Sequence, residues 1–447
     1  MKIRVFKYPS KKAKLFLKKL EDRVESFPEK IEREVKKIGN RVRKEGDKAL
    51  IEYTSKFDGV LMTSKEFRVE EEEIRRAYQE VSEELLSAIR LAIEKIRKFH
   101  LKGLSLSWFE YEEEGLVLGQ LVRAVESVGL YIPGGKAGET PLISTVIMSA
   151  IPAKIAGVKK LVMVSPPRKN KTLHPALLVA AKEAEIDEIY KIGGPWSIFG
   201  LAYGTETLPK VEMICGPGNI YVTLAKKIVS SWVGIDLLAG PSEVLIIADQ
   251  SAPSEFIVWD LLAQAEHDPF SLPLLITNSA KLVKEVREKL FLALKEGVRS
   301  EIASKALSQR GGIILVKDLK TAFEISNLIA PEHLEIMLEN PWEWLYLVKN
   351  AGAVFLGAYT PEAIGDYLAG PNHILPTMGL ARFTSSLSTE KFLKKINFMQ
   401  YSFSSLKKEA QAVINLAEAE NLPFHAQAVK IRLEKMERGL PKNERIF

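Results

Sequence analysis

The spacing of apolar residues changes near residue 128 and divides the chain into two parts. Between residues 25 and 100, apolar residues recur at steps of three and four, with charged residues between them. This period predicts amphipathic helices, and the face from Ile74 to Ile96 is interpreted as core without chemistry of its own. His100 closes this pattern, where a cation suits the end of a helix, and is interpreted as structural.

After residue 128, short apolar runs alternate with helical segments. A first series contains VGLYIP, KKLVMVSPP and VEMICGPGN, and a second begins near residue 243 with EVLIIAD and continues to AGAVFLG. Alternation of this kind predicts parallel sheets covered by helices on both faces. We therefore expect an α/β protein with two doubly wound, Rossmann-like lobes, which bind ligands beyond the carboxyl ends of their strands.

The same patterns suggest the domain boundaries. Residues 1–24 are basic and weakly patterned, and they predict a helical N-terminal arm. The first α/β lobe is expected to be discontinuous, with residues 25–128 and 242–384. The second lobe is expected at residues 129–241, and residues 385–447, where the alternation is lost, are expected to form a C-terminal tail.

Composition narrows the class of protein. A chain of 447 residues is too long for a single core, and its net charge of +6 arises from 63 basic and 57 acidic residues that are mixed throughout. Without a basic run or a basic patch interleaved with aromatic residues, we expect no nucleic-acid partner. The single cysteine, Cys215, excludes disulfides and cysteine-based zinc clusters within the chain. We see no signal peptide and no apolar run of membrane-spanning length, so we expect a cytoplasmic protein with no membrane partner.

Glycines follow three of the apolar runs, in PGG (133–135), GG (193–194) and GPGN (216–219). Glycine at such corners lets the backbone approach a ligand closely, and a following helix N-terminus offers amides to a phosphate. None of the three is a complete GxGxxG motif. Alone they are compatible with a dinucleotide site and equally with ordinary turns of an α/β fold.

The stretch LLAQAEHDP, residues 261–269, predicts a metal site. On a helix, Gln264 and His267 project from one face, which places an amide oxygen beside an imidazole. Zinc favours imidazole or charged ligands, so chemistry alone would prefer Glu266 or Asp268 to the amide, and only the shared face argues for Gln264. A polar helix edge that faces solvent explains the same pair.

Two further segments hold candidate catalytic residues. APEHLE contains the adjacent Glu332 and His333, which supply two groups able to take protons near neutral pH. GDYLAGPNHILPT contains Asp366 and His373 in a loop rich in glycine and proline. Each residue alone is equally compatible with a capping aspartate or a surface histidine.

Together these segments closely resemble the histidinol dehydrogenase family, from about residue 30 to residue 430. The resemblance rests on VGLYIPGG, AIPAKIAGVKKLVMVSPP, GPGN, AGPSEVLIIAD, LLAQAEHDP, APEHLE, GDYLAGPNHILPT and, near the end, LPFHAQAV after AEN. It implies a zinc-dependent oxidation of L-histidinol through L-histidinal to L-histidine, with the reduction of two NAD+, as the last steps of histidine synthesis.

The family's site residues carry over to positions of this chain. His333 would be the general base of both hydride transfers, and Glu332 would help to activate water for the second. The zinc ligands would be Gln264, His267, Asp366 and His425, which would also contact the substrate together with His333, Ser242, His373 and Glu420. The NAD site would be lined by Tyr131, Trp196 and Asn219.

Glu420 and His425 lie in the C-terminal tail, which in the family reaches across a homodimer. The resemblance therefore implies shared active sites, one zinc ion per subunit and a dimer required for activity.

The chain departs from the family pattern where Trp196 replaces a glutamine that commonly contacts NAD. An indole can stack on a ring but cannot replace both functions of an amide. The loop after Gly135 is also longer than usual, and Asn421 replaces a glycine. Three alternatives remain: a dehydrogenase on the same scaffold for another small alcohol, such as a sulfonated diol, a zinc hydrolase, and a binding protein without activity.

Overall fold

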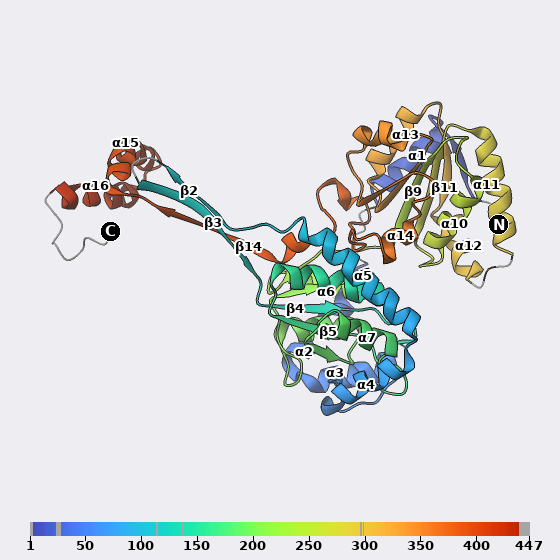
Figure 1. Ribbon diagram of the computed structural model, residues 1–447, viewed down its shortest axis with the longest axis horizontal. Coiled ribbons are helices and arrows are strands. Elements are labelled where there is room, and N and C mark those ends of the chain that lie inside the picture. Colours follow the sequence, from blue (N-terminus) through green and yellow to red (C-terminus); the bar gives the residue numbers. More distant parts are fainter. Residues whose placement is uncertain are drawn as a thin grey trace. The chain divides into compact units, whose positions relative to one another are not determined.

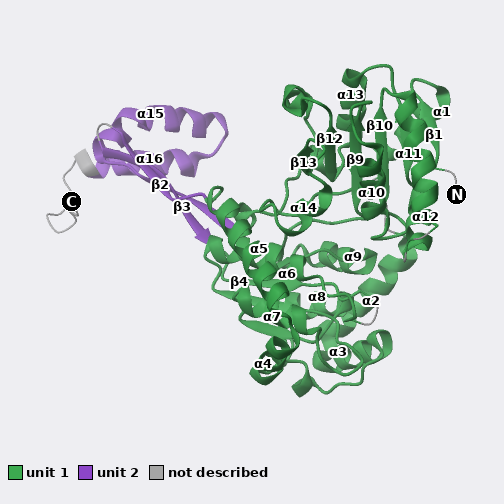
Figure 2. Ribbon diagram, turned by 45° about the vertical axis from the view of Figure 1, so that its right-hand side comes forward, with its two compact units in different colours: residues 1–104, 125–392 green, residues 105–124, 393–447 purple. Residues whose placement is uncertain are grey.

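The computed structural model forms two compact units (Figure 2). The larger unit contains residues 1–104 and 125–392, and the smaller contains residues 105–124 and 393–447. The structure describes residues 3–23, 28–112, 115–135, 138–295, 297 and 299–437.

One parallel sheet of the larger unit contains β9 and β11 (Figure 1). It has six strands in the order β1-β11-β10-β9-β12-β13. The strands are β1 (Val5–Lys7), β9 (Glu243–Ala248), β10 (Leu272–Thr277), β11 (Gly312–Leu315), β12 (His333–Met337) and β13 (Ala353–Leu356). Every residue of β9, β10 and β12 is buried. Strands covered on both faces require such continuous runs, and this explains why EVLIIA and LPLLIT lack alternation.

Helices cover both faces of this sheet. Val244 and Ile246 of β9 pack into one core, and the intervening Leu245 and Ile247 pack into a core on the other face. The helices on the first face are α10 (Ser254–Ala265), α11 (Ala280–Ala293) and α12 (Ser300–Gln309). Those on the second face are α1 (Lys11–Glu21) and α13 (Leu319–Ile329).

The other parallel sheet has five strands in the order β6-β5-β4-β7-β8. The strands are β4 (Ser127–Tyr131), β5 (Lys160–Val164), β6 (Glu188–Tyr190), β7 (Met213–Cys215) and β8 (Gly234–Ile235). Around it lie α2 (Glu29–Glu45), α3 (Asp47–Tyr53), α4 (Glu71–Glu80), α5 (Glu83–Leu101), α6 (Ile143–Ala156), α7 (Pro175–Glu183), α8 (Gly194–Tyr203) and α9 (Ile220–Val229). The predicted α/β class with two parallel sheets is confirmed.

The helices between residues 29 and 101 belong to the five-stranded sheet, which corrects the predicted grouping of residues 25–128 with 242–384. Val35 of α2 and Leu50 of α3 lie in one core with Val162 of β5 and Phe199 of α8. A helical period shows which face of a helix is apolar, but not which sheet that face covers. The prediction failed for this reason.

The predicted N-terminal arm is an integral part of the six-stranded lobe. Val5 of β1 pairs in parallel with Ile313 of β11, and Phe16, Leu17 and Leu20 of α1 are buried in the core of that sheet. The helix was predicted, but the many lysines between these residues obscured that its apolar face belongs to the core. Residues 3–23 therefore form an edge strand and a covering helix.

The smaller unit contains an antiparallel sheet in the order β14-β3-β2. Its strands are β2 (Trp108–Glu112), β3 (Leu116–Ala124) and β14 (Leu393–Gln400), followed by α15 (Phe403–Ala419) and α16 (Pro423–Glu437). Ile414, Ala417 and Ala426 join the two helices in a small core. The predicted tail is thus only part of this unit, because residues 105–124 complete its sheet.

None of the described helices is at once long enough and apolar enough to cross a membrane.

Candidate functional site

Glu332 and His333 stand at the amino end of β12. His333 is the first residue of that strand, opposite Val244 of β9 and Ala353 of β13. Both side chains are buried. These two candidate residues thus lie at the amino end of a strand, not beyond the carboxyl end where parallel sheets usually bind ligands. The short helix α14 (Glu362–Tyr367), which follows β13, brings its acidic side chains to the same end.

The two ring nitrogens of His333 have different surroundings. Nδ1 lies 3.0 Å from the backbone carbonyl oxygen of Glu243, so it carries the proton and donates. Nε2 is buried, has no hydrogen-bond partner among the described residues, and lies 3.8 Å from Asp366 Oδ1. Burial is the main cause that lowers the pKa of His333. The ring is thus neutral near pH 7, with a free lone pair on Nε2.

Four carboxyl groups are buried around this histidine: Asp260, Glu332, Glu335 and Glu362. Burial raises the pKa of each, to about 6 for Asp260 and well above the usual range for the three glutamates. Two accept backbone hydrogen bonds, Glu332 from the N–H of Glu243 at 2.8 Å and Glu335 from the N–H of Glu362 at 2.9 Å. Uncompensated acids in one buried cluster favour the binding of a cation.

A group of side chains that could hold a metal ion lies at the edge of this cluster. Ligand atoms of His267, Glu362 and Asp366 all lie within 4.8 Å of one another. Zinc takes imidazole and carboxylate ligands at about 2.0–2.2 Å, so the three groups fit one ion after small movements. The structure therefore brings two predicted ligands, His267 and Asp366, together and adds Glu362.

Gln264 reaches this group through Glu362. It is fully buried near the end of α10, and with its amide oriented to satisfy both groups its nitrogen donates to the two Glu362 oxygens at 2.8 and 3.0 Å. His267 lies two residues beyond the end of the helix and is exposed. The helix ends at Ala265, so Gln264 and His267 do not form the predicted pair on one helical face. Both side chains nevertheless lie beside Glu362.

His373 and Ser242 flank the same region. Nδ1 of His373 lies 2.9 Å from the backbone oxygen of Asp366, and burial lowers the pKa of His373. Ser242 directly precedes Glu243 and β9, and its backbone oxygen accepts a hydrogen bond from Leu272 N–H at 2.9 Å. Both therefore belong to the neighbourhood of His333 and Asp366.

Glu420 and His425 lie in the smaller unit. Glu420 caps the C-terminus of α15, His425 lies in the first turn of α16, and both are exposed. The structure thus leaves these two predicted site residues on a separate compact unit.

Three glycine corners stand at the carboxyl ends of strands in the five-stranded sheet, after β4, β6 and β7. A Cβ added to Gly134 or Gly193 would lie 2.6 or 2.5 Å from Pro166, and one added to Gly216 would lie 2.1 Å from the backbone oxygen of Tyr131. Only glycine allows so close an approach. The corners therefore converge at one edge, as expected for a nucleotide-binding lobe.

Two of the three predicted NAD contacts, Tyr131 and Asn219, lie at this edge and differ in burial. Tyr131 ends β4 and is buried, and burial raises the pKa of its hydroxyl. Asn219 is exposed and caps α9, because its Oδ1 accepts hydrogen bonds from Tyr221 N–H at 3.0 Å and Val222 N–H at 3.2 Å.

Trp196, the third predicted NAD contact, is buried. Its ring is 4% exposed and stacks on Phe57 at 5.4 Å between centroids, and Nε1 donates to Thr54 Oγ1 at 3.2 Å. The indole N–H and much of the ring are thus used within the core. That Trp196 lines the NAD site stays a prediction, and these contacts leave its indole no free N–H donor for a cofactor.

The sequence reasoning missed Asp260, Glu335 and Glu362. Glu362 was detectable, since it lies four residues before Asp366 and two carboxylates at this spacing share a helical face. Asp260 and Glu335 carried no comparable pattern, because they sit within apolar runs that predict only core.

Comparisons with known proteins agree on one family. The family model described as histidinol dehydrogenase matches residues 21–433. Histidinol dehydrogenase of Thermosynechococcus vestitus is 52% identical over 391 residues, which cover 88% of this chain and 90% of that protein. The enzyme of Carboxydothermus hydrogenoformans is 49% identical over 405 residues, or 91% and 94% of the two chains. The crystal structure of histidinol dehydrogenase from Elizabethkingia anophelis matches with a TM-score of 0.91 and 38% identity, over 97% of this chain and 99% of that one.

Proposed function

The chain belongs to the histidinol dehydrogenase family and is an NAD-dependent dehydrogenase, and from this premise we propose that it oxidises L-histidinol to L-histidine. The reaction passes through L-histidinal and reduces two NAD+. Zinc would be held by Gln264, His267 and Asp366 of one subunit and by a second subunit's copy of His425.

One observation carries this proposal. The Nε2 atom of His333 is buried and without a partner among the described residues, and it lies 3.8 Å from Asp366, a member of the metal-binding group. A neutral imidazole at this position is ready to accept a proton from a substrate anchored beside it.

The side chains divide the work of the first oxidation. His333 Nε2 accepts the hydroxyl proton of histidinol while the carbinol hydrogen leaves as a hydride. When bound, zinc supplies a Lewis acid that anchors the imidazole and amine of the substrate. Ser242, His373 and Glu420 complete the substrate contacts.

The second oxidation needs water. After His333 has released its first proton to solvent, water adds to the aldehyde to give the hydrate, and Glu332 helps to take the proton of that water. His333 then takes the hydroxyl proton of the hydrate as a second hydride leaves to the second NAD+. The products are the carboxylic acid and two NADH per substrate. Glu332 suits this role because it is buried directly beside His333.

The cofactor is assigned to the glycine corners of the five-stranded sheet. NAD+ supplies the acceptor for each pair of electrons. Tyr131 and Asn219 would border it, and the helix that Asn219 caps directs its N-terminus to this edge.

The experiment that tests this function follows NADH absorbance with L-histidinol, NAD+ and the purified protein, before and after chelation. We expect two NADH per histidinol, loss of turnover with chelator and recovery with zinc. One NADH per substrate, or indifference to chelation, would contradict the mechanism. NADH from a sulfonated diol but not from histidinol would assign another substrate.

We further propose that two subunits share each site through His425. Mixing a His333→Asn variant with a His425→Ala variant should restore part of the activity, because one site of each mixed dimer has both residues. A mixture as inactive as its components, although the mixed dimer forms, would refute shared sites.

A further inference from the structure

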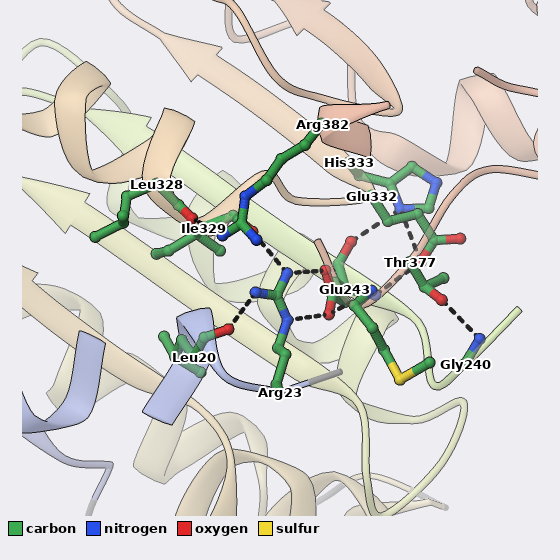
Figure 3. Close-up of polar contacts among 11 residues, drawn as sticks. Leu20, Arg23, Gly240, Glu243, Leu328, Ile329, Glu332, His333, Thr377 and Arg382 are labelled. Atoms are coloured by element: carbon green, nitrogen blue, oxygen red, sulfur yellow. Dashed lines mark hydrogen bonds and ion pairs between the residues drawn. The ribbon is translucent and has the colours of Figure 1, made fainter. Parts of the chain in front are cut away.

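The residue that contacts both Glu332 and His333 through its backbone is Glu243, the first residue of β9. Its N–H donates to Glu332 Oε2 at 2.8 Å, and its carbonyl oxygen accepts from His333 Nδ1 at 3.0 Å (Figure 3). The orientation of one peptide segment therefore sets the position of the carboxyl group and the tautomer of the imidazole.

The Glu243 side chain is held by a buried arginine from the N-terminal segment. Arg23 Nε and Nη2 donate to the two Glu243 oxygens at 2.7 and 2.8 Å, and both side chains are less than 5% exposed. Arg23 also donates to the backbone oxygens of Ile329, at 2.8 Å, and Leu20 (Figure 3). This two-point contact fixes the plane of the carboxylate as a single hydrogen bond does not.

The same carboxylate reaches the loop that holds His373. Glu243 Oε1 accepts a hydrogen bond from Met378 N–H at 3.1 Å, and the adjacent Thr377 Oγ1 accepts from Gly240 N–H at 2.6 Å. Glu243 thus connects α1, the segment before β12 and the loop after α14.

We propose that Arg23 and Glu243 are positioning residues for the reaction, acting through the Glu243 backbone on His333 and Glu332. The inference rests on the proposed function, since it assigns the base role to His333. Stability alone explains the pair poorly, because an apolar pair of similar volume is often as stable as a buried ion pair. Without Arg23, the carboxylate loses the two hydrogen bonds that fix its plane, and the backbone that it anchors can move with it.

The test compares Arg23→Met and Arg23→Lys with the parent protein. We expect Arg23→Met to lower kcat by about 100-fold with little change in KM for histidinol, because a misplaced base affects the chemical step more than binding. Arg23→Lys keeps the charge but not the two-point contact, and should lie between the two. Zinc content should not change.

A second readout does not require turnover. With 15N-labelled histidine, and His333→Gln to assign the resonance, the parent should show a protonated Nδ1 and an unprotonated Nε2 for His333. In the Arg23 variants this pattern should give way to mixed tautomers.

The matched control is Asp47→Ala, which removes a buried charged anchor from the other lobe. Asp47 accepts hydrogen bonds from Thr205 Oγ1 at 2.6 Å and Thr207 N–H at 3.2 Å. It should lower thermal stability without changing kcat or the His333 tautomer. If Arg23→Met does not fold, Arg23→Lys decides the matter by the same measurements.

A folded Arg23 variant with kcat within about twofold of the parent and an unchanged tautomer would overturn the inference. So would equal losses of kcat in Arg23→Lys and Asp47→Ala. If the parent does not oxidise histidinol, the proposed function fails, while the tautomers of the parent and the Arg23 variants still test the positioning.

Discussion

The two parallel-sheet lobes each contain a group of buried ionisable side chains, and the two groups differ in their partners. In the five-stranded lobe, Lys226 pairs with Asp236, its Nζ donates to Gly216 O at 2.8 Å, and Asp236 accepts from Gly216 N–H at 2.8 Å. Each of these two charges meets an opposite charge and the backbone of the GPGN corner. In the six-stranded lobe, Asp260, Glu332, Glu335 and Glu362 cluster around a neutral histidine.

This difference distinguishes buried ionisable groups that stabilise the fold from those that can bind a ligand. A compensated pair holds a loop in one conformation and has no capacity left for a ligand. Several acids without compensation stay buried only if they bind protons or a cation. The second arrangement is therefore the one that we propose as the reactive part of the molecule, and the Arg23–Glu243 pair beside it resembles the first.

The largest expected effect comes from replacing the histidine of the six-stranded lobe. His333→Asn should lower kcat by about 10²–10⁴-fold, the usual contribution of a general base, with unchanged zinc content. Turnover and metal analysis measure the two quantities.

The other lobe offers a matched control for this variant. His100 is also buried, its Nε2 also has no partner among the described residues, and burial lowers its pKa to about 4. His100→Asn should leave kcat unchanged. Equal losses of kcat in the two variants would show that the difference between the lobes is unrelated to activity.

A smaller effect is expected on the metal. Glu362→Gln removes one carboxylate from the group with His267 and Asp366 and changes the hydrogen bond to Gln264, so zinc affinity should fall by about 10–100-fold. Competition with a chelator measures this affinity. Glu335→Gln, a neighbour outside the metal group, should bind zinc like the parent, and equal weakening in both variants would argue against a specific role for Glu362.

The smallest effect is a pH-dependent change in stability within the five-stranded lobe. Asp58 lies beside Tyr131, its Oδ2 has no partner among the described residues, and burial raises its pKa from 3.8 to about 7. The folded protein therefore holds this proton more tightly than the unfolded chain. Its contribution is fully present below pH 3.8 and is lost as the pH rises through about 7.

Asp58→Asn removes this loss of stability at high pH. Its free energy of unfolding in urea, relative to the parent, should rise by about 2 kcal/mol between pH 5 and pH 8, since one pKa unit corresponds to about 1.4 kcal/mol. The exposed Glu80→Gln should show no such trend. A difference between Asp58→Asn and the parent that does not vary with pH would contradict the assignment.

Much of the larger unit followed from its hydrophobic pattern. Continuous runs such as EVLIIA predicted buried parallel strands, and the glycine corners fell at the carboxyl ends of β4, β6 and β7. Pairings between distant segments were not predictable. Nothing near Val5 indicates that it pairs with Ile313, and nothing in α2 indicates which sheet it covers.

For the site, too, local features were predictable and long-range contacts were not. His333 and Asp366 were recognisable by residue type and local context, and the structure places them close together. The burial of Trp196 was not predictable, since it depends on Thr54 and Phe57, more than a hundred residues earlier. The proposed role of Arg23 could not be predicted from the sequence, because an arginine in a lysine-rich segment is usually exposed to solvent.

The pairing of β1 with β11 has a consequence for the order of folding. During synthesis the first strand emerges early, but its partner at residues 312–315 emerges only after most of the chain. Until then β1 has no partner strand, and an unpaired strand is a place where chains associate wrongly. The enzyme thus cannot complete this edge of its six-stranded sheet before residues 312–315 have been made.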